Sequence, residues 1–529
     1  MAITPEDTTA APLPDPNRWM IAMAVMFGAV MAVMDISVVN VALPHMMGNF
    51  GQNISSITWV ATAYSIAAVI MVTMSNWWST LLGRKYFYLL SFVIFTVGSI
   101  LCGFAHTFPE MIIYRIIQGI GGGSLIPIAQ AIIRETFPRK EQGMAMAVFS
   151  MGVVVAPAIG PVLGGWLTDQ LGWPWIFFIN IPISIIGMFL VWLYVHDPVY
   201  LRRGIQKVDV PGIVLLTLGL TGLQTILERG QQENWFDSNF IVWGTIFTIT
   251  TLTLLVLWEL RVKEPIVNFR VFKNEQFSLG CMVIFLFGIA LFGTTFILPQ
   301  FTQRLLNYPA FQAGLTLMPR AIALIIVLPL VGKLYNHSDP RALMLFGIVV
   351  VCISYFQLAH LATIAGSSNI ISILLLMGAG MPFLFIPLST LTLNSVPKES
   401  STAATGLFNL TQQIGGNVGY ALMATLLDRF STIHHAYLSE NISPYNPNYT
   451  LFAQQASATL ASKGMAAGGQ GQSSILAIVN RLVTQQAEMM AYNDLSIVLM
   501  FLFLCCIPLI IIMRAPKGGM HSNPHVGEM

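Results

Sequence analysis

Hydrophobic residues in this chain form long runs separated by short polar segments. Fourteen runs are close to the roughly 20 residues that a helix needs to cross a hydrocarbon core about 30 Å thick. Helices are the only fit, because other open structures would leave backbone polar groups unsatisfied in lipid. The predicted spans are residues 19–43, 56–79, 86–105, 110–133, 142–168, 175–196, 210–228, 239–259, 277–302, 310–333, 342–362, 368–394, 402–427 and 492–514.

The composition agrees with this pattern. Hydrophobic residues make up 55% of the 529 positions and charged residues only 9%, whereas a soluble protein carries about 25% charged residues. We therefore predict an all-α polytopic membrane protein embedded in a lipid bilayer. The first run lacks a small-residue cleavage site, which favours a retained span over a signal peptide. Residues 1–17 and 515–529 are predicted to be tails.

Positive charge is distributed unevenly between the two sides. Of the 25 Lys and Arg residues, 18 fall on the side of the two termini, five on the other side, and two, Arg115 and Arg320, inside spans. Short cytoplasmic loops retain positive charge, so both termini are predicted to be cytoplasmic. The net charge of +2 reflects this topology and does not indicate a nucleic-acid partner.

The two ends of the chain resemble each other at an offset of 255 to 259 residues. Leu43-Pro44 matches Leu298-Pro299, and "FSMGVVVAPAIG" (149–160) matches "FNLTQQIGGNVG" (408–419). Two parallel six-helix repeats are the architecture of one large class of transporters. The predicted domains are an N-terminal six-helix half (18–200), two inserted helices (201–270) and a C-terminal six-helix half (271–514).

One connection, residues 428–491 on the side opposite the termini, is far longer than usual. It is either a disordered spacer or a docking surface, although "SSILAIVNRLVTQQAEMMAY" within it has a helical pattern. His434 and His435 lack a third ligand at metal-site spacing, so we predict a solvated pair and no metal site. The five cysteines lie in apolar spans and are predicted to pack as small hydrophobic residues.

Asp35, in "VMDISVVNVALP" (33–44), is an acid in an apolar run. A charge in a span costs roughly 2.5 to 3.5 kcal/mol on insertion scales and normally faces a partner or a wet cavity. At 1.5 Å per residue, Asp35 lies about 12 Å and Arg115 about 8 Å below the outer surface, so the two side chains can meet.

Desolvation favours a neutral carboxyl group, whereas a nearby arginine favours the ionised form. We therefore predict that Asp35 takes a proton from outside and releases it inside. A static ion pair that only orients two helices is the alternative.

Small residues at four-residue spacing mark two further spans. Arg115, Gly119, Gly123 and Pro127 share one helix face in "YRIIQGIGGGSLIP". In "MGVVVAPAIGPVLGGWL" a smooth face allows close helix approach and two prolines predict a bend. Five residues of this second segment are predicted to form a hinge or seal at a moving interface: Gly152, Pro157, Gly160, Pro161 and Gly164.

A polar stripe in the thirteenth span, Asn409, Gln413 and Asn417, would be costly against lipid. It either lines a cavity or contacts another helix, and the adjacent glycines favour a cavity. Methionines near Asp35 add a flexible, polarizable surface of the type that can bind ligands of different shape. The predicted substrate cavity consists of Met31, Met34, Val38, Gln118, Asn409, Gln413 and Asn417.

Four segments together resemble the fourteen-span drug:proton antiporters of the major facilitator superfamily: "MDISVVNVALP", "YRIIQGIGGGSLIP", "APAIGPVLGGW" and "WPWIFFINIPI". The segment "HHAYLSENISPYNPN" is similar to the long outer loop of EmrB-type exporters of Gram-negative bacteria. This resemblance implies the major facilitator fold, with 14 transmembrane helices arranged as 6 + 2 + 6. It also implies that Asp35 and Arg115 couple proton flow to transport.

The resemblance further implies proton-driven export of small hydrophobic compounds across the bacterial inner membrane, with no cofactor. A periplasmic membrane-fusion adaptor and an outer-membrane channel would be reached through loop 428–491. Gly83, Arg84 and Lys85 match the family's cytoplasmic gate, but Asn76 and Thr80 replace its usual glycine and aspartate. That replacement puts the charge lock of the gate in doubt.

Other classes of protein fit the sequence less well. An enzyme is not expected, because there is no phosphate-binding GxxxxGK[ST] motif and no catalytic cluster at one interface. An exporter of narrower range, for fatty acids or bile salts, remains an alternative. A facilitator without proton coupling is another, and it would not need Asp35 to titrate.

Overall fold

The computed structural model describes residues 17–52, 54–197, 209–262, 265–306, 308, 310–335, 337–361, 367–397, 400–440, 442, 445–462 and 470–514. These residues are almost entirely helical. The predicted tails lie outside the described residues, apart from Asn17, as does the predicted boundary at residue 200.

The helices follow one another with short connections. In chain order they are α1 (Arg18–Phe50), α2 (Ile54–Ile57), α3 (Trp59–Leu82), α4 (Arg84–Gly103), α5 (Phe108–Thr136), α6 (Arg139–Gln170), α7 (Trp175–Phe178), α8 (Asn180–Tyr194), α9 (Val210–Arg229), η2 (Trp235–Asp237), α10 (Asn239–Arg261), η3 (Phe269–Lys273), α11 (Glu275–Gln300), η4 (Phe301–Leu305), α12 (Ala310–Leu334), α13 (Pro340–Leu358), α14 (Ser367–Asn394), α15 (Ser401–Ser439), α16 (Pro447–Ser462), α17 (Gln470–Leu504) and α18 (Cys506–Ile512).

The helices account for the predicted spans. Among the described residues, twelve are long and apolar enough to cross a membrane, and α6 adds a thirteenth as a bent pair, Glu141–Pro157 and Val162–Gln170. The bend of 42° falls at the two prolines, as predicted. The predicted thirteenth span is α15, whose polar stripe lowers its apolar character. The all-α membrane fold is confirmed.

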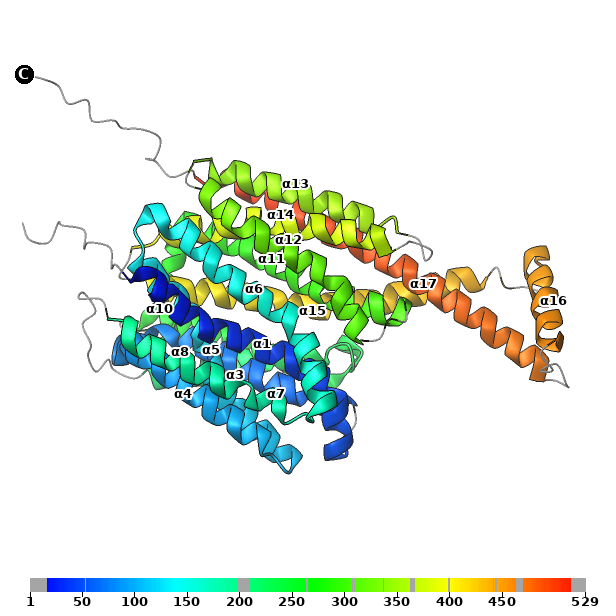
Figure 1. Ribbon diagram of the computed structural model, residues 1–529, viewed down its shortest axis with the longest axis horizontal. Coiled ribbons are helices and arrows are strands. Elements are labelled where there is room, and N and C mark those ends of the chain that lie inside the picture. The colour runs from blue at the N-terminus through cyan, green and yellow to red at the C-terminus, as the bar shows by residue number, and fades with distance from the viewer. Residues whose placement is uncertain are drawn as a thin grey trace, which may run out of the picture.

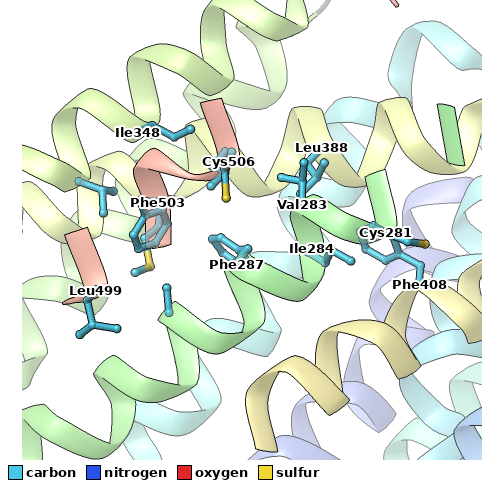
Figure 2. Packing of buried hydrophobic residues seen from close by; sticks show 14 of the residues in the cluster. Cys281, Val283, Ile284, Phe287, Ile348, Leu388, Phe408, Leu499, Phe503 and Cys506 are labelled. Carbon is cyan, nitrogen blue, oxygen red and sulfur yellow. The ribbon is translucent and has the colours of Figure 1, made fainter. Parts of the chain in front are cut away.

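The helices form two groups that lie side by side. In Figure 1, α1, α3, α4, α5, α7 and α8 lie on one side of the bundle and α11 to α14 on the other, with α6 running between them. The first group has an apolar cluster of its own, and a second cluster fills the other group and extends to residues of α3, α6 and the inserted helices. In the second group, Figure 2 shows Phe287 of α11 beside Phe503 of α17, with Leu388 and Ile348 nearby.

Glycines set the register between α5 and α3. Arg115 donates from Nε to the carbonyl oxygen of Val60 at 2.9 Å. One turn further, a Cβ on Gly119 would lie 2.5 Å from the carbonyl oxygen of Tyr64, and one on Gly123 would lie 2.6 Å from Cα of Ala68. The face that Arg115 shares with the glycines is therefore the face on which α5 packs against α3.

The other two small-residue faces pack in the same manner. On α6, a Cβ at Gly160 would lie 2.5 Å from Cβ of Ser37 in α1, and one at Gly164 would lie 2.9 Å from Val38. On α15, a Cβ at Gly419 would lie 2.9 Å from Cα of Ile289 in α11. The glycines beside the polar stripe thus serve contact with α11.

The two groups touch at the predicted cytoplasmic end. A Cβ on Gly332 of α12 would lie 2.9 Å from Cβ of Ala147 in α6, and one on Gly406 of α15 would lie 3.3 Å from the carbonyl oxygen of Val72 in α3. Arg134 at the end of α5 also donates to the carbonyl oxygen of Val396 at 2.7 Å. These contacts close the bundle at this end.

The inserted helix α9 contacts both groups. Its Glu228 accepts a hydrogen bond from Thr62 of α3, and its Gln224 accepts one from Asn417 of α15. Beyond α9, Trp235 donates from Nε1 to Thr425 of α15 at 2.8 Å. The insert therefore bridges the two halves at the end opposite the closed one.

The long connection 428–491 is largely helical where it is described. Helix α15 continues to Ser439, and α17 starts at Gln470, well before its apolar section. Figure 1 shows these extensions and α16 projecting from the bundle as an arm. His434 pairs with Asp494 at 2.7 Å, and His435 contacts Asn480, so both histidines join α15 to α17. Within its described residues the arm is a folded projection.

Replacing Gly419 with alanine is expected to destabilise the fold. The added Cβ would overlap the α11 backbone, and overpacking of this kind costs about 1–3 kcal/mol. The melting temperature of the purified protein should fall by several degrees. Gly48→Ala is the matched control, since a Cβ there meets nothing within 4 Å and alanine favours the helix. Equal melting temperatures for the two variants would contradict the close-packing argument.

Candidate functional site

The structure brings Asp35 of α1 and Arg115 of α5 into direct contact. Arg115 Nη1 donates to Asp35 Oδ2 at 2.6 Å. The two side chains are 0% and 1% exposed. Two opposite charges this close offset part of the cost of taking each one out of water, provided that their remaining hydrogen-bonding atoms are satisfied.

Three further polar side chains complete the hydrogen bonding. Gln118 donates to Asp35 Oδ1 at 2.8 Å and accepts from Arg115 at 2.6 Å. Asn180, at the start of α8, donates to the same Oδ1 at 3.1 Å. Ser99 of α4 accepts from both amides, at 3.2 Å and 3.0 Å. Four helices, α1, α4, α5 and α8, thus meet at one carboxylate.

Aromatic rings cover the guanidinium. Arg115 Cζ lies 4.4 Å from the ring centroid of Tyr64 and 5.7 Å from that of Phe177. A cation over an aromatic face is attracted by the ring quadrupole, and more strongly where water is excluded. The cluster of Asp35, Arg115, Gln118, Asn180 and Ser99, hereafter the ion-pair cluster, is therefore sealed from solvent.

Sequence reasoning missed Ser99, Asn180 and Tyr64. Asn180 had a usable signal, since it is an isolated amide in the apolar segment "WPWIFFINIPI". Whether Ser99 faces Asp35 depends on how α4 is rotated about its axis. The sequence pattern did not predict this rotation. Gln118, which was predicted to line the substrate cavity, lies instead in the ion-pair cluster and is fully buried.

The other predicted cavity residues divide into two sets. Met31, Met34 and Val38 are buried in the packing of the first half, and Met31 accepts a hydrogen bond from Ser184. Their place in a substrate cavity stays a prediction. The stripe on α15 faces the first half, because Asn409 donates to Gln130 of α5 at 2.7 Å. Gln413 is half-buried between the two stripe asparagines.

The predicted gate residues have partners that the sequence did not indicate. Arg84 forms a buried ion pair with Glu135 at the end of α5. The backbone of Lys85 donates to Asp197 at 2.9 Å, and its Nζ donates to the carbonyl oxygen of Trp192. Thr80 donates to the carbonyl oxygen of Asn76 within α3. Glu135 thus provides Arg84 with a carboxylate in spite of the altered motif.

Among the residues that the structure describes, no group of three or more His, Cys, Asp or Glu side chains could hold a metal ion. Within the same residues, all five cysteines are free.

The fold defines the class of protein. The structure matches the proton:xylose symporter XylE with a TM-score of 0.59 at 13% identity, covering 94% of this chain and 96% of that one. It also matches the human organic anion transporter MFSD10 with a TM-score of 0.59 at 13% identity, covering 92% and 100%. The architecture is that of major facilitator transporters.

The sequence comparisons narrow this class. Residues 25–420 match the Major Facilitator Superfamily model. The chain is 31% identical to the multidrug export protein EmrB of Escherichia coli K12, over 96% of this chain and 98% of that protein. It is also 31% identical to the fatty acid resistance protein FarB of Neisseria gonorrhoeae, over 93% and 96%. The chain belongs to the Major Facilitator Superfamily and, within it, to the family of EmrB-type multidrug export proteins.

Removing Arg115 alone should be more damaging than removing both charges. Arg115→Gln leaves Asp35 buried without its cation, which typically costs about 3–5 kcal/mol. The double variant Asp35→Asn with Arg115→Gln should recover most of this loss. The measurement is the unfolding of purified proteins in denaturant. Arg514→Gln serves as control, because its pair with Glu275 is highly exposed. A double variant no more stable than Arg115→Gln would contradict the argument.

Proposed function

We propose that the protein is a proton-coupled antiporter that exports hydrophobic or amphiphilic toxic compounds across the bacterial inner membrane by alternating access. The observation that carries the proposal is the sealed contact between Asp35 and Arg115 in the first half. Ionisable residues inside membrane spans mark ion pathways and proton relays. Asp35 is the carboxylate of this cluster, so it is the group to which a proton would bind.

Proton binding at Asp35 would loosen the ion-pair cluster. A neutral Asp35 no longer attracts Arg115, whose other contacts are with Gln118, Val60 and the ring of Tyr64. A protonated carboxyl also needs an acceptor for its hydrogen. The amide oxygen of Asn180 has no donor among the described residues, and rotation of the amide would present this oxygen to Asp35.

This change would reach the helices that must move. The carboxylate joins α1 to α5 and α8 directly and to α4 through the amides that Ser99 binds, so its neutralisation affects the contacts of four helices. The closed end depends on α6 against α12 and α3 against α15, and α6 itself packs on α1. A change in the protonation of Asp35 in α1 would therefore act on α6, which packs against α1 and forms part of the closed end. Alternating access requires this end to open.

The orientation that fits this mechanism has both termini in the cytoplasm. The closed end would then face the cytoplasm and the arm the periplasm. The arm exposes apolar side chains far from the bundle, among them Tyr437 of α15 at 62% and Leu482 of α17 at 48%. We propose that the arm docks a periplasmic membrane-fusion adaptor that leads to an outer-membrane channel.

The substrates are proposed to be small hydrophobic compounds, and the EmrB relative, which is named a multidrug export protein, supports drugs as their class. A narrower range centred on fatty acids is the second candidate, favoured by the equal identity to FarB. A facilitator without proton coupling is less well supported, since it would not need a buried carboxylate.

Asp35→Asn is expected to abolish proton-driven export while the protein remains folded and inserted. Asparagine can keep the hydrogen bonds to Gln118 and Asn180 but cannot exchange a proton. The measurement is transport of a fluorescent dye into everted vesicles under an imposed pH gradient. Asp237→Asn is the matched control, because Asp237 is exposed outside the spans. Wild-type rates in Asp35→Asn would show that the pair is only structural.

Replacing residues 440–475 with a short linker should preserve transport across the inner membrane but prevent transfer of the substrate to the adaptor and outer-membrane channel. Export in vesicles should persist, because the ion-pair cluster lies in the bundle, whereas drug resistance of whole cells should be lost. The two measurements are vesicle transport and the minimal inhibitory concentration. Equal loss in both would indicate that the arm supports folding and not docking.

A further inference from the structure

Arg320 is a second arginine inside the bundle, and its surroundings differ from those of Arg115. It lies on α12, in the predicted tenth span. Ile322, Ile326 and Leu330 are 48%, 68% and 58% exposed and mark the outward face of this helix. Arg320 lies on the opposite side, in line with the buried Leu324 and Val331. Its side chain therefore points into the second half, away from lipid.

The guanidinium of Arg320 has no anionic partner among the described residues. Its hydrogen-bonding contact there is with the thioether sulfur of Met381 on α14, 3.5 Å from Nη2. A thioether is a weak acceptor. Arg115, by contrast, has a carboxylate, an amide oxygen and a carbonyl oxygen. Arg320 is also partly exposed, although it lies on the interior side of α12.

The internal repeat gives this asymmetry a structural context. An offset of 256 residues places Arg320 at the position of Tyr64, and Tyr355 at the position of Ser99. Both Tyr64 and Ser99 belong to the surroundings of the Asp35 carboxylate. An offset of 255 places Ala290 at the position of Asp35. The second half thus has a cation where the first half has an aromatic ring, and alanine where the first half has its acid.

We propose that Arg320 binds the anionic head group of the substrate, and that the preferred substrates are amphiphiles with one carboxylate and an apolar tail. This inference rests on the export function proposed above. A cation inside a membrane protein normally pairs with an anion, and a guanidinium binds a carboxylate through charge-assisted hydrogen bonds. The substrate would supply the carboxylate that the protein lacks.

The side chains near Arg320 on α12 and α14 are apolar. Met381 and Met377 of α14 and Leu324 of α12 are buried in the same apolar core. Methionine is flexible and fills irregular space, so it accommodates tails of different shape. A hydrated inorganic anion would gain nothing from these contacts, which favours an amphiphile over chloride.

The test compares three twelve-carbon probes: dodecanoate, dodecanol and dodecyltrimethylammonium. Binding is measured with purified protein in lipid nanodiscs, and transport in everted vesicles under a pH gradient. Arg320→Gln should weaken dodecanoate binding about tenfold to a hundredfold, the range for a lost hydrogen bond to a charged group. Binding of the other two probes should change by less than about threefold.

Two further variants keep the result interpretable. Arg320→Lys should restore part of the dodecanoate affinity, because it keeps the charge. Met381→Glu should weaken dodecanoate binding, because it supplies an internal carboxylate that pairs with Arg320. Arg481→Gln, an exposed arginine of the arm, should behave as wild type. Melting temperatures separate loss of binding from loss of folding.

The outcomes distinguish this inference from the proposed function. Wild-type protein that does not bind dodecanoate, or equal loss of all three probes in folded Arg320→Gln, would overturn the role of Arg320. Competition by chloride as strong as that by dodecanoate would overturn the amphiphile assignment. If wild-type vesicles transport none of the probes, the export proposal fails, but nanodisc binding still decides whether Arg320 recognises a carboxylate.

Discussion

The cost of holding ionised groups away from water is the constraint on which this structure depends. Asp35 and Arg115 are both buried, and either charge left there without its partner typically costs about 3–5 kcal/mol. Their compensation is local, because both carboxylate oxygens of Asp35 and the Nε and Nη1 atoms of Arg115 have hydrogen-bond partners and the ring of Tyr64 covers the guanidinium. Since these partners come from α1, α3, α4, α5 and α8, one ion pair fixes the mutual positions of five helices.

The small residues make that compensation possible. An arginine can reach Val60 and Asp35 together only if α5 lies close to its neighbours. Gly119 and Gly123 allow this approach to α3, and Gly98 of α4 allows the approach to α5 at Gln118. In membrane proteins such contacts are stabilised by van der Waals packing, because lipid is as apolar as the side chains and gives no hydrophobic gain. The glycine faces and the ion-pair cluster are thus two parts of one arrangement.

The sequence predicted the features that depend on length and depth. Spans follow from the thickness of the hydrocarbon core, and the contact of Asp35 with Arg115 follows from their similar depth. Features that depend on helix rotation were not predictable in this way. Asn180, Ser99 and Glu135 complete buried polar contacts, yet their spacing along the chain indicates neither their partners nor their facing directions. Gln118 was assigned to the substrate cavity, whereas in the structure both polar atoms of its side chain bind within the ion-pair cluster.

The contacts between the two halves suggest why the bundle can move at all. Where α15 meets the first half and the insert, two of the contacts are between amides, Asn409 with Gln130 and Asn417 with Gln224. Glu228 and Thr62 form another polar contact, between the insert and α3. When two amides or hydroxyl groups separate, each can form a hydrogen bond to water instead, so the net free-energy cost is small. Separating two apolar faces costs roughly 25 cal/mol of free energy for each Å² of surface exposed to water. The polar part of this interface can separate and re-form readily, whereas opening the closed end must also part the close contacts of Gly332 with Ala147 and of Gly406 with Val72. How readily each part of the interface separates therefore follows from which residues lie there.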